Sequence, residues 1–217
     1  MGEDRWRDAV EHLLTAEPLF SSIVASSGPC VLGKNAEGLD VFARLATTIL
    51  RKQLSGKAAA AIESRFRAVS PDKPFPEPAD ILSLTVEDLR SAGISRQKAG
   101  CLKELAAHAL GVDGRRLPTF PDLVQMGDDE VVAALTCVKG IGRWSVEMLL
   151  MFDLGRPDVF PVSDLGIRRG MQELLRLREP PSEREMLERA EPWRPFRSVA
   201  SWYLWRVRDT VVRPSGV

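Results

Sequence analysis

The hydrophobic residues of this chain recur every three or four positions, which is the spacing of one face of an α-helix. Two early segments show it clearly, with predicted inward positions Trp6, Ala9, Val10, Leu13 and Leu14, and then Phe42, Leu45, Ala46, Ile49 and Leu50. The period-two alternation of strands is nearly absent, and no internal repeat is visible. The pattern therefore predicts an all-α protein of about ten helices.

Residues with capping preferences mark where several of these helices begin. Asp40, Ser55 and Ser95 stand at three predicted starts, and Thr85 with Asp88 resembles a capping box. Further helices are predicted over 56–69, 129–137, 143–153, 164–178, 183–190 and 195–209, with connections at 71–78 and 111–121.

The composition is that of an ordinary globular protein. Of 217 residues, 44% are hydrophobic and 28% are charged, which suits one generous domain or two small ones that share a core. Thirty basic residues balance thirty acidic residues, so a basic surface for a nucleic acid has to be local. Neither a secretory signal nor a bilayer-spanning apolar run is visible, and so no membrane partner is expected. The expected location is the cytoplasm or nucleoid of a bacterium, or otherwise the nucleus.

The three cysteines, Cys30, Cys101 and Cys137, lie far apart and form no C-x-x-C pair. This spacing predicts reduced thiols, and it argues against a zinc site or an iron–sulfur cluster. No cofactor for catalysis is therefore expected.

The segment KGIGRW, residues 139–144, places Gly140 and Gly142 one residue apart. It comes within one residue of the dinucleotide fingerprint G-x-G-x-x-G, but that fingerprint requires a preceding strand, and here the preceding residues have helical spacing. A P-loop is excluded because no Gly-Lys-Ser/Thr follows. What remains is two helices joined by a tight hairpin, and the second helix can bind a phosphate through its first N–H groups. From the hairpin alone, a turn that only packs the two helices is an equally good interpretation.

The longer segment 135–170, LTCVKGIGRWSVEMLLMFDLGRPDVFPVSDLGIRRG, favours the first interpretation. It resembles the hairpin, loop and aspartate signature of the helix–hairpin–helix (HhH-GPD) DNA glycosylase superfamily. Three segments resemble its alkylbase branch, 3-methyladenine DNA glycosylase II, namely ILRKQLSGKAA at 49–59, GRWSVEM at 142–148 and EPWRPFRSVASWYLW at 191–205.

The resemblance implies an enzyme of base-excision repair. Such an enzyme flips alkylated purines, for example 3-methyladenine or 7-methylguanine, out of double-stranded DNA and hydrolyses their N-glycosidic bond. Asp164 matches the catalytic aspartate, and one fixed carboxylate suffices because an alkylated purine leaves without a general acid. Taken alone, Asp164 is also a typical cap for the helix that follows it, and both roles can hold. Relatives that cut the strand have a lysine where this chain has Trp144, so lyase activity is not expected.

Further site residues follow from the same match. Trp205 matches the base-stacking tryptophan, and Trp144 and Met148 are expected to line the pocket, although Trp144 could also fill the core. Expected DNA contacts are the apolar wedge Leu54 with its neighbours Gln53, Ser55 and Lys57, and the hairpin residues Gly140, Gly142, Arg143 and Ser145. The backbone carbonyls of Thr136, Val138 and Ile141 are expected to hold a monovalent cation, sodium or potassium.

The expected architecture is a single glycosylase core over residues 1–217, with the active-site cleft between two helical subdomains. Residues 42–156, with the helix–hairpin–helix at about 129–153, form the central subdomain, and 1–41 together with 157–217 form the second. No extra amino-terminal α/β domain is expected, and the protein is expected to be a monomer. Two other function classes stay open, a non-catalytic module that binds damaged DNA and a helical protein–protein adaptor.

Overall fold

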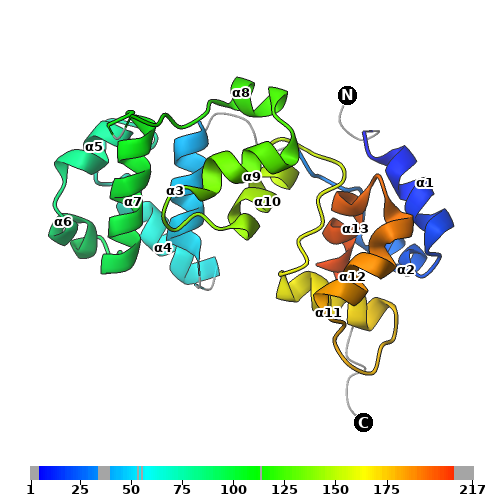
Figure 1. Ribbon diagram of the computed structural model, residues 1–217. Coiled ribbons are helices and arrows are strands. Elements are labelled where there is room, and N and C mark those ends of the chain that lie inside the picture. The colour runs from blue at the N-terminus through cyan, green and yellow to red at the C-terminus, as the bar shows by residue number, and fades with distance from the viewer. Residues whose placement is uncertain (1–4, 34–39, 53, 55, 113, 208–217) are drawn as a thin grey trace, which may run out of the picture. The chain divides into compact units, whose positions relative to one another are not determined.

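The regular structure of this chain is entirely helical wherever it is described. The computed structural model describes residues 5–33, 40–52, 54, 56–112 and 114–207 (Figure 1). These residues contain thirteen α-helices, one short 3-10 helix and no strand, which confirms the predicted all-α fold. The chain divides into two compact units, and each is described by itself. Unit 1 contains residues 1–36 and 150–217, and unit 2 contains residues 37–149. The predicted subdomain limits lie a few residues later, and the predicted cleft between the subdomains stays a prediction.

Unit 2 is organised around one long helix, α7, against which α3, α5 and α6 pack (Figure 1). Its helices are α3 (Val41–Arg51), α4 (Gly56–Arg67), α5 (Pro78–Ser83), α6 (Val86–Ser91), α7 (Arg96–Ala109), α8 (Phe120–Gln125) and α9 (Asp128–Thr136). Helix α10 (Arg143–Phe152) begins in unit 2 and ends in unit 1. Fully buried side chains include Leu45, Leu50, Phe66, Ile81, Leu89, Leu102 and Leu105. These residues form the apolar core of unit 2.

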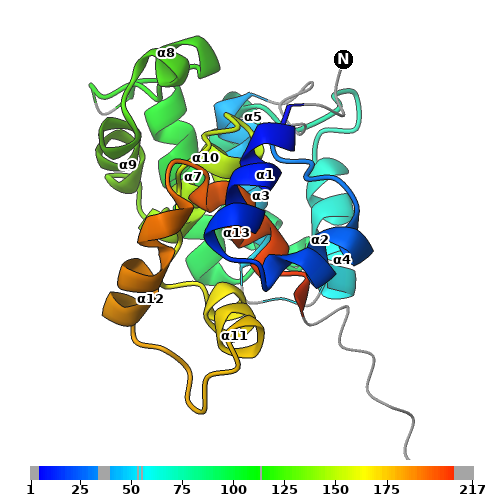
Figure 2. The same cartoon turned by 90° about the vertical axis from the view of Figure 1, so that its right-hand side faces the viewer.

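Unit 1 combines amino-terminal and carboxyl-terminal helices, because α13 packs against α1, α2 and α11 (Figure 2). Its helices are α1 (Arg7–Ala16), α2 (Phe20–Ser27), α11 (Leu165–Leu174), α12 (Glu183–Ala190), the 3-10 helix η1 (Glu191–Trp193) and α13 (Arg197–Leu204). Its fully buried side chains include Trp193, Tyr203, Phe20 and Leu13. Trp193 lies edge-on to Phe20, with ring centroids 5.3 Å apart. Helix α13 is buried on all sides, which is why it can serve as the support for α11.

The capping residues predicted for α3, α6 and α7 are confirmed. Asp40 caps α3, where its carboxylate accepts the N–H of Ala43 at 2.8 Å. Thr85 and Asp88 form the capping box of α6, and the pKa of Asp88 is held low by the hydroxyl and the N–H of Thr85. Ser95 caps α7. Ser55, the predicted cap of α4, lies outside the described residues.

The expectation of about ten helices was too low. Helix α2 was missed because its eight residues show no clear hydrophobic period, and α5 and α8 were missed because the prolines around them suggested connections. Two of them begin with a proline-containing first turn, where proline is tolerated because no N–H is needed there. Helix α11 also ends before the predicted residue 178, because Arg176 adopts a left-handed backbone conformation with φ 51°. None of the described helices is both long and apolar enough to cross a lipid bilayer.

Candidate active site and nucleic-acid interface

Asp164 stands at the amino-terminal end of α11, where its side chain is half-buried. It is the N-cap of that helix, and its Oδ1 accepts the backbone N–H of Ile167 at 2.9 Å. The capping interpretation is therefore confirmed. The positive end of the helix dipole favours a negative charge at this position. The hydrogen bond to Ile167 thus fixes the orientation of the carboxylate.

The indole Nε1–H of Trp205 also donates a hydrogen bond to Oδ1 of Asp164, at 3.0 Å. Trp205 is the C-cap of α13, and its ring stacks on Phe152 at the end of α10, with centroids 5.7 Å apart and planes 21° from parallel. The structure therefore brings two of the predicted site residues, Asp164 and Trp205, into direct contact. Phe152 was not among the predicted site residues, since nothing in the local pattern distinguishes it from a core aromatic.

The loop that leads to Asp164 is anchored by the first residues of α13. Arg197 is buried, and its Nε and Nη2 donate to the two carboxylate oxygens of Asp158 at 2.7 and 3.0 Å. Ser198 uses its hydroxyl to accept the N–H of Val159 at 2.8 Å, and its own N–H donates to the carbonyl of Pro157 at 2.9 Å. Bidentate pairs of this kind are geometrically specific. The Arg-Ser pair of the carboxyl-terminal motif therefore holds the loop in place, a role that the motif alone did not reveal.

The two hairpin glycines, Gly140 and Gly142, serve different purposes. Gly140 has φ 91°, and a Cβ at this position would lie 2.6 Å from the Sγ of Cys101 on α7. The Cβ side of Gly140 therefore faces a neighbouring helix, and the phosphate contact expected of its backbone stays a prediction. Gly142 has open space around the position of a Cβ, and its carbonyl accepts the N–H groups of Ser145 and Val146 as α10 begins. Of the two glycines, Gly142 is the one that leaves room for a ligand at the start of α10.

The remaining hairpin residues differ in how far they face solvent. Trp144 is 38% exposed, and the alternative that it fills the core is wrong. Arg143 is exposed and pairs with Glu147 one turn later, Nε to Oε1 at 3.1 Å. Met148 is half-buried on the same helix. Ser145 is only 3% exposed, so its hydroxyl is not on the surface with Arg143 and Trp144.

The hairpin turn is closed by backbone hydrogen bonds. The N–H of Ile141 donates to the carbonyl of Val138 at 3.0 Å, and the N–H of Lys139 donates to Oε1 of Glu104 on α7 at 3.1 Å. Helix α9 ends just before, at Thr136, so its last carbonyls point into this turn. Among the described residues, no three His, Cys, Asp or Glu side chains lie where they could bind a metal ion together. A cation at the hairpin would have to use backbone carbonyls.

The turn that carries Leu54 is held from two sides. Leu54 is 36% exposed, and Lys57 on α4 is exposed, whereas Gln53 and Ser55 lie outside the described residues. Lys98 on α7 donates to the carbonyls of Leu50 and Lys52 at 2.7 and 2.8 Å, which caps the end of α3. Burial lowers the pKa of the Lys98 ammonium. Lys98 was missed by the sequence analysis because its partners are more than forty residues away.

A second contact ties α3 to α4 next to this turn. Glu63 is almost buried and accepts hydrogen bonds from Arg51, at 2.7 Å, and from Arg67, at 2.8 Å. Burial by itself would raise the pKa of Glu63, but the hydrogen bonds from Arg67 and Arg51 outweigh it and hold the pKa below its ordinary value. Leu54 is therefore an exposed apolar side chain between α3 and α4, and hydrogen bonds from Lys98 and to Glu63 hold these helices in place.

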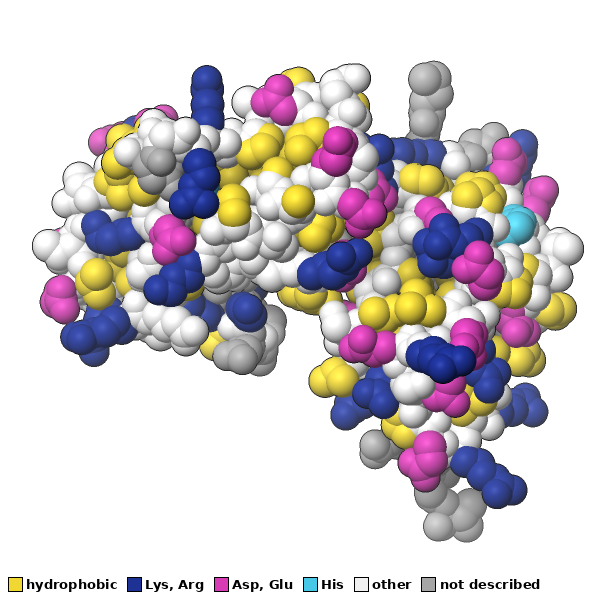
Figure 3. Space-filling view, viewed as in Figure 1, with side chains coloured by type: hydrophobic (Ala, Val, Ile, Leu, Met, Phe, Trp, Pro, Cys, Tyr) yellow, Lys and Arg dark blue, Asp and Glu magenta, His cyan; other side chains and the backbone are white. Residues whose placement is uncertain are grey.

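Charge on the surface is mixed. On the face shown in Figure 3, basic and acidic side chains alternate over both units. A local excess follows Asp164, where Arg168, Arg169, Arg176 and Arg178 accompany only Glu173 between residues 165 and 178. A basic footprint for a polyanion is thus confined to particular segments, as the balanced composition predicts.

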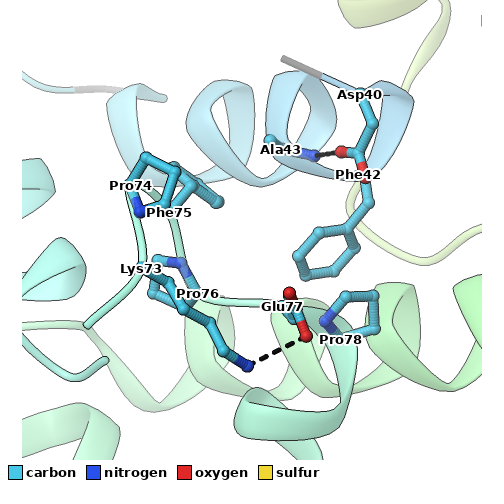
Figure 4. Close-up of a pocket in the computed structure, with 9 residues that line it drawn as sticks. All are labelled: Asp40, Phe42, Ala43, Lys73, Pro74, Phe75, Pro76, Glu77 and Pro78. Atoms are coloured by element: carbon cyan, nitrogen blue, oxygen red, sulfur yellow. Dashed lines mark hydrogen bonds and ion pairs between the residues drawn. The ribbon is translucent and has the colours of Figure 1, made fainter. Parts of the chain in front are cut away.

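A pocket of about 220 Å³ lies away from these residues, in unit 2 (Figure 4). The proline-rich connection and the start of α3 form its walls, with Phe42, Phe75 and Pro78 among the lining side chains. Its charged groups already have partners within the protein, since Asp40 caps α3 and Lys73 pairs with Glu77 at 2.9 Å. The pocket contains none of the predicted site residues, and its charged groups stabilise the connection and the start of α3.

Comparisons with known proteins agree with this geometry. A family model described as HhH-GPD superfamily base excision DNA repair protein matches residues 46–195. DNA-3-methyladenine glycosylase 1 of Schizosaccharomyces pombe is 35% identical over 195 residues, which cover 90% of this chain and 84% of that protein. The alkylbase DNA glycosidase-like protein mag2 of the same yeast is 30% identical over 203 residues, 93% of each chain. A solved structure of the Schizosaccharomyces pombe 3-methyladenine DNA glycosylase in complex with abasic DNA has a TM-score of 0.83 at 35% identity, over 94% of this chain and 98% of that chain.

Proposed function

Because the chain belongs to the HhH-GPD superfamily of base excision DNA repair proteins, we propose that it is a DNA glycosylase that excises alkylated purines. The family membership confirms the resemblance found in the hairpin and loop motifs. DNA is the substrate, and the names of the relatives point to bases such as 3-methyladenine. The observation that carries the proposal is the Asp164 carboxylate, held at the start of α11 by two N–H donors, Ile167 and Trp205.

The proposed chemistry needs only one carboxylate. Departure of a cationic purine leaves positive charge on the deoxyribose, and a fixed anion nearby stabilises that charge as it develops. A base that already carries a positive charge leaves without protonation, so no general acid is required. In this proposal Asp164 stabilises the oxocarbenium-like sugar and orients the water that attacks it. The two hydrogen bonds to Oδ1 keep the carboxylate from rotating.

Only one face of the Trp205 indole is available to a flipped base in this proposal. Phe152 covers one face of the indole, so a flipped base would stack on the opposite face. A cationic base over an indole gains cation–π energy on the order of 1–2 kcal/mol when water is excluded. This gain would favour alkylated purines over normal ones. Trp144 and Met148 on α10 are also proposed as residues that contact the flipped base.

The proposed DNA contacts come from two places in unit 2. At the hairpin, the first N–H groups of α10 after Gly142 would bind a phosphate, and the exposed Arg143 would add charge. At the turn after α3, Leu54 would fill the gap left by the flipped base, with Gln53, Ser55 and Lys57 beside it. Phosphate contacts carry no sequence information, which suits an enzyme that searches for damage anywhere.

The test of this proposal is direct. The protein is incubated with duplex DNA that was treated with a methylating agent, and the released bases are identified by mass spectrometry, with untreated DNA as the control. We expect 3-methyladenine and 7-methylguanine in the supernatant and intact abasic strands in the DNA. Retention of abasic DNA without release of any base would contradict the proposal and support a non-catalytic damage sensor.

The same incubation with borohydride tests whether the strand is cut. An amine that displaced the base would form an imine with the sugar, and borohydride would reduce it to a stable protein–DNA adduct. At the hairpin position of the lysine in strand-cutting relatives this chain has Trp144, whose indole nitrogen is not nucleophilic. We therefore expect no adduct and no strand breaks before alkali or heat. An adduct, or breaks without such treatment, would overturn the assignment of a purely hydrolytic enzyme.

We also propose a monovalent cation at the hairpin, held by the carbonyls of Thr136, Val138 and Ile141. The support is the end of α9 at Thr136, where the last carbonyls lack partners within the helix, followed at once by the closed turn that contains Val138 and Ile141. The affinity for an abasic duplex is compared in sodium, potassium and tetramethylammonium chloride at equal ionic strength, so that screening is the same in all three. We expect weaker binding in tetramethylammonium, which is too large for the turn. Equal affinity in all three salts would remove the cation from the proposal.

A further inference from the structure

A glycine, Gly166, lies against the edge of the Trp205 indole that carries Cδ1 and Nε1. It is in the first turn of α11, two residues after Asp164. A Cβ on Gly166 would lie 2.8 Å from Cδ1 and 3.2 Å from Nε1 of Trp205, and 3.0 Å from Oδ1 of Asp164. Real Cβ atoms are essentially never found as close as 2.8 Å. Any larger residue would therefore displace the indole from the carboxylate.

A second glycine on the same helix face explains how the indole comes so close. Gly170 is one turn after Gly166, and a Cβ there would lie 2.1 Å from the carbonyl oxygen of Leu204, the last residue of α13. Because neither glycine carries a side chain, the backbones of α11 and α13 approach closely at this point. Trp205 follows Leu204, and this close approach places its ring over the start of α11.

One face of the indole is supported by Phe152. The two rings are nearly parallel at 5.7 Å, so Trp205 is held by Gly166 at its edge and by Phe152 on one face. Only in this position does Nε1–H reach Oδ1 of Asp164 at 3.0 Å. A charge-assisted hydrogen bond of this kind is about twice as strong as a neutral one, and it depends on geometry.

We propose that Gly166 is a positioning residue, which keeps the indole N–H of Trp205 on Oδ1 of Asp164, and that Trp205 acts on the reaction through this hydrogen bond as well as by stacking. The inference rests on the proposed role of Asp164 in base release. Gly166 touches neither the sugar nor the base in this scheme. Its effect passes through the indole to the orientation of the carboxylate.

The first arm of the test measures kinetics. Single-turnover release of 7-methylguanine is compared for wild type, Gly166→Ala, Trp205→Phe, Trp205→Ala and the double variant Gly166→Ala/Trp205→Ala. Loss of a hydrogen bond to a charged group predicts a roughly 10- to 100-fold slower release for Gly166→Ala and for Trp205→Phe, which keeps an aromatic face. Affinity for an abasic duplex should stay within about twofold of wild type for Gly166→Ala, because phosphate contacts lie elsewhere.

The double variant distinguishes the indole route from a direct effect on Asp164. If Gly166 acts through Trp205, adding Gly166→Ala to Trp205→Ala should change the rate by less than about twofold, since coupled residues are not additive. A full additional loss in the double variant would overturn the proposal. The matched control is Gly100→Ala in α7, another helical glycine with open space around its Cβ position. Its rate should equal that of wild type.

The second arm does not depend on activity. The indole N–H groups of the five tryptophans are observed in a nitrogen-15 NMR spectrum, and the Trp205 signal is identified by its loss in Trp205→Phe. We expect this signal to move in Gly166→Ala and in Asp164→Ala, and to stay in place in Gly100→Ala. An unmoved signal in Gly166→Ala would overturn the positioning role. If wild type releases no base at all, the proposed function fails, and the NMR arm still decides whether Gly166 holds Trp205 on Asp164.

Discussion

Asp164→Asn is expected to lower the rate of base release by about 100- to 1,000-fold while leaving duplex affinity within about twofold of wild type. Asparagine is nearly isosteric and still caps a helix, so the N–H groups of Ile167 and Trp205 keep an acceptor. What is lost is the negative charge that stabilises the developing cation on the sugar. Single-turnover release of 7-methylguanine and binding to an abasic duplex measure the two quantities.

The matched control for this variant is Asp40→Asn. Asp40 is also an N-cap aspartate, at the start of α3, and its carboxylate accepts a backbone N–H at 2.8 Å. If capping were the whole role of Asp164, both variants would behave alike. Near-normal release by Asp164→Asn would remove Asp164 from the catalytic role, whatever the effect at Asp40.

Gly140→Val is expected to lower the thermal stability of the protein, whereas Gly142→Val is expected to weaken its binding to DNA. Valine at Gly140 would be forced to φ 91° with its Cβ 2.6 Å from the Sγ of Cys101. Left-handed backbone costs about 1–2 kcal/mol and overpacking about 1–3 kcal/mol, so the Tm should fall by roughly 5–15 °C. At Gly142 the Cβ position is open, so the Tm should stay near that of wild type.

The binding measurements should separate the two glycines further. Gly142→Val places a branched side chain where a phosphate would meet the start of α10, and loss of a hydrogen bond to a charged group predicts about 10- to 100-fold weaker binding. This loss should be the same for duplexes of unrelated sequence, because backbone N–H groups read no bases. Fluorescence anisotropy with several duplexes measures the affinities, and thermal unfolding measures the Tm. A loss confined to one sequence or one lesion, or an unchanged Tm in Gly140→Val, would contradict this division of roles.

The site could be predicted from the sequence only where it depends on local chemistry. The cap at Asp164 is such a case, because an aspartate followed by a helix satisfies the N–H two or three residues later without help from the rest of the protein. The two hairpin glycines show the limit of such reasoning. Both are expected to face a phosphate, which stays a prediction, and the structure shows in addition that Gly140 packs against Cys101. The positive φ of Gly140 serves a helix–helix contact, which no pattern of adjacent residues records.

The helices, too, could be predicted only where local sequence properties determine them. Helices with two or more turns of regular apolar spacing, such as α3 and α7, were predicted with their buried residues, since the period of a helix is itself a local property. The six-residue helices α5 and α8 were missed, although each has a capping box, because the proline-rich character of their surroundings suggested connections.

What the sequence by itself determined about this protein is its helical class, the caps that start its helices, and the motifs that place it in a family of DNA repair proteins. Only the tertiary structure decided which of those residues meet. Trp205 reaches Asp164 across 41 residues, Arg197 holds Asp158 across 39, and Lys98 caps α3 from α7. The physical reason is that periodicity and capping act over one turn of helix, whereas these contacts depend on how closely two helices pack, as the side-chain-free face of α11 at Gly166 and Gly170 permits.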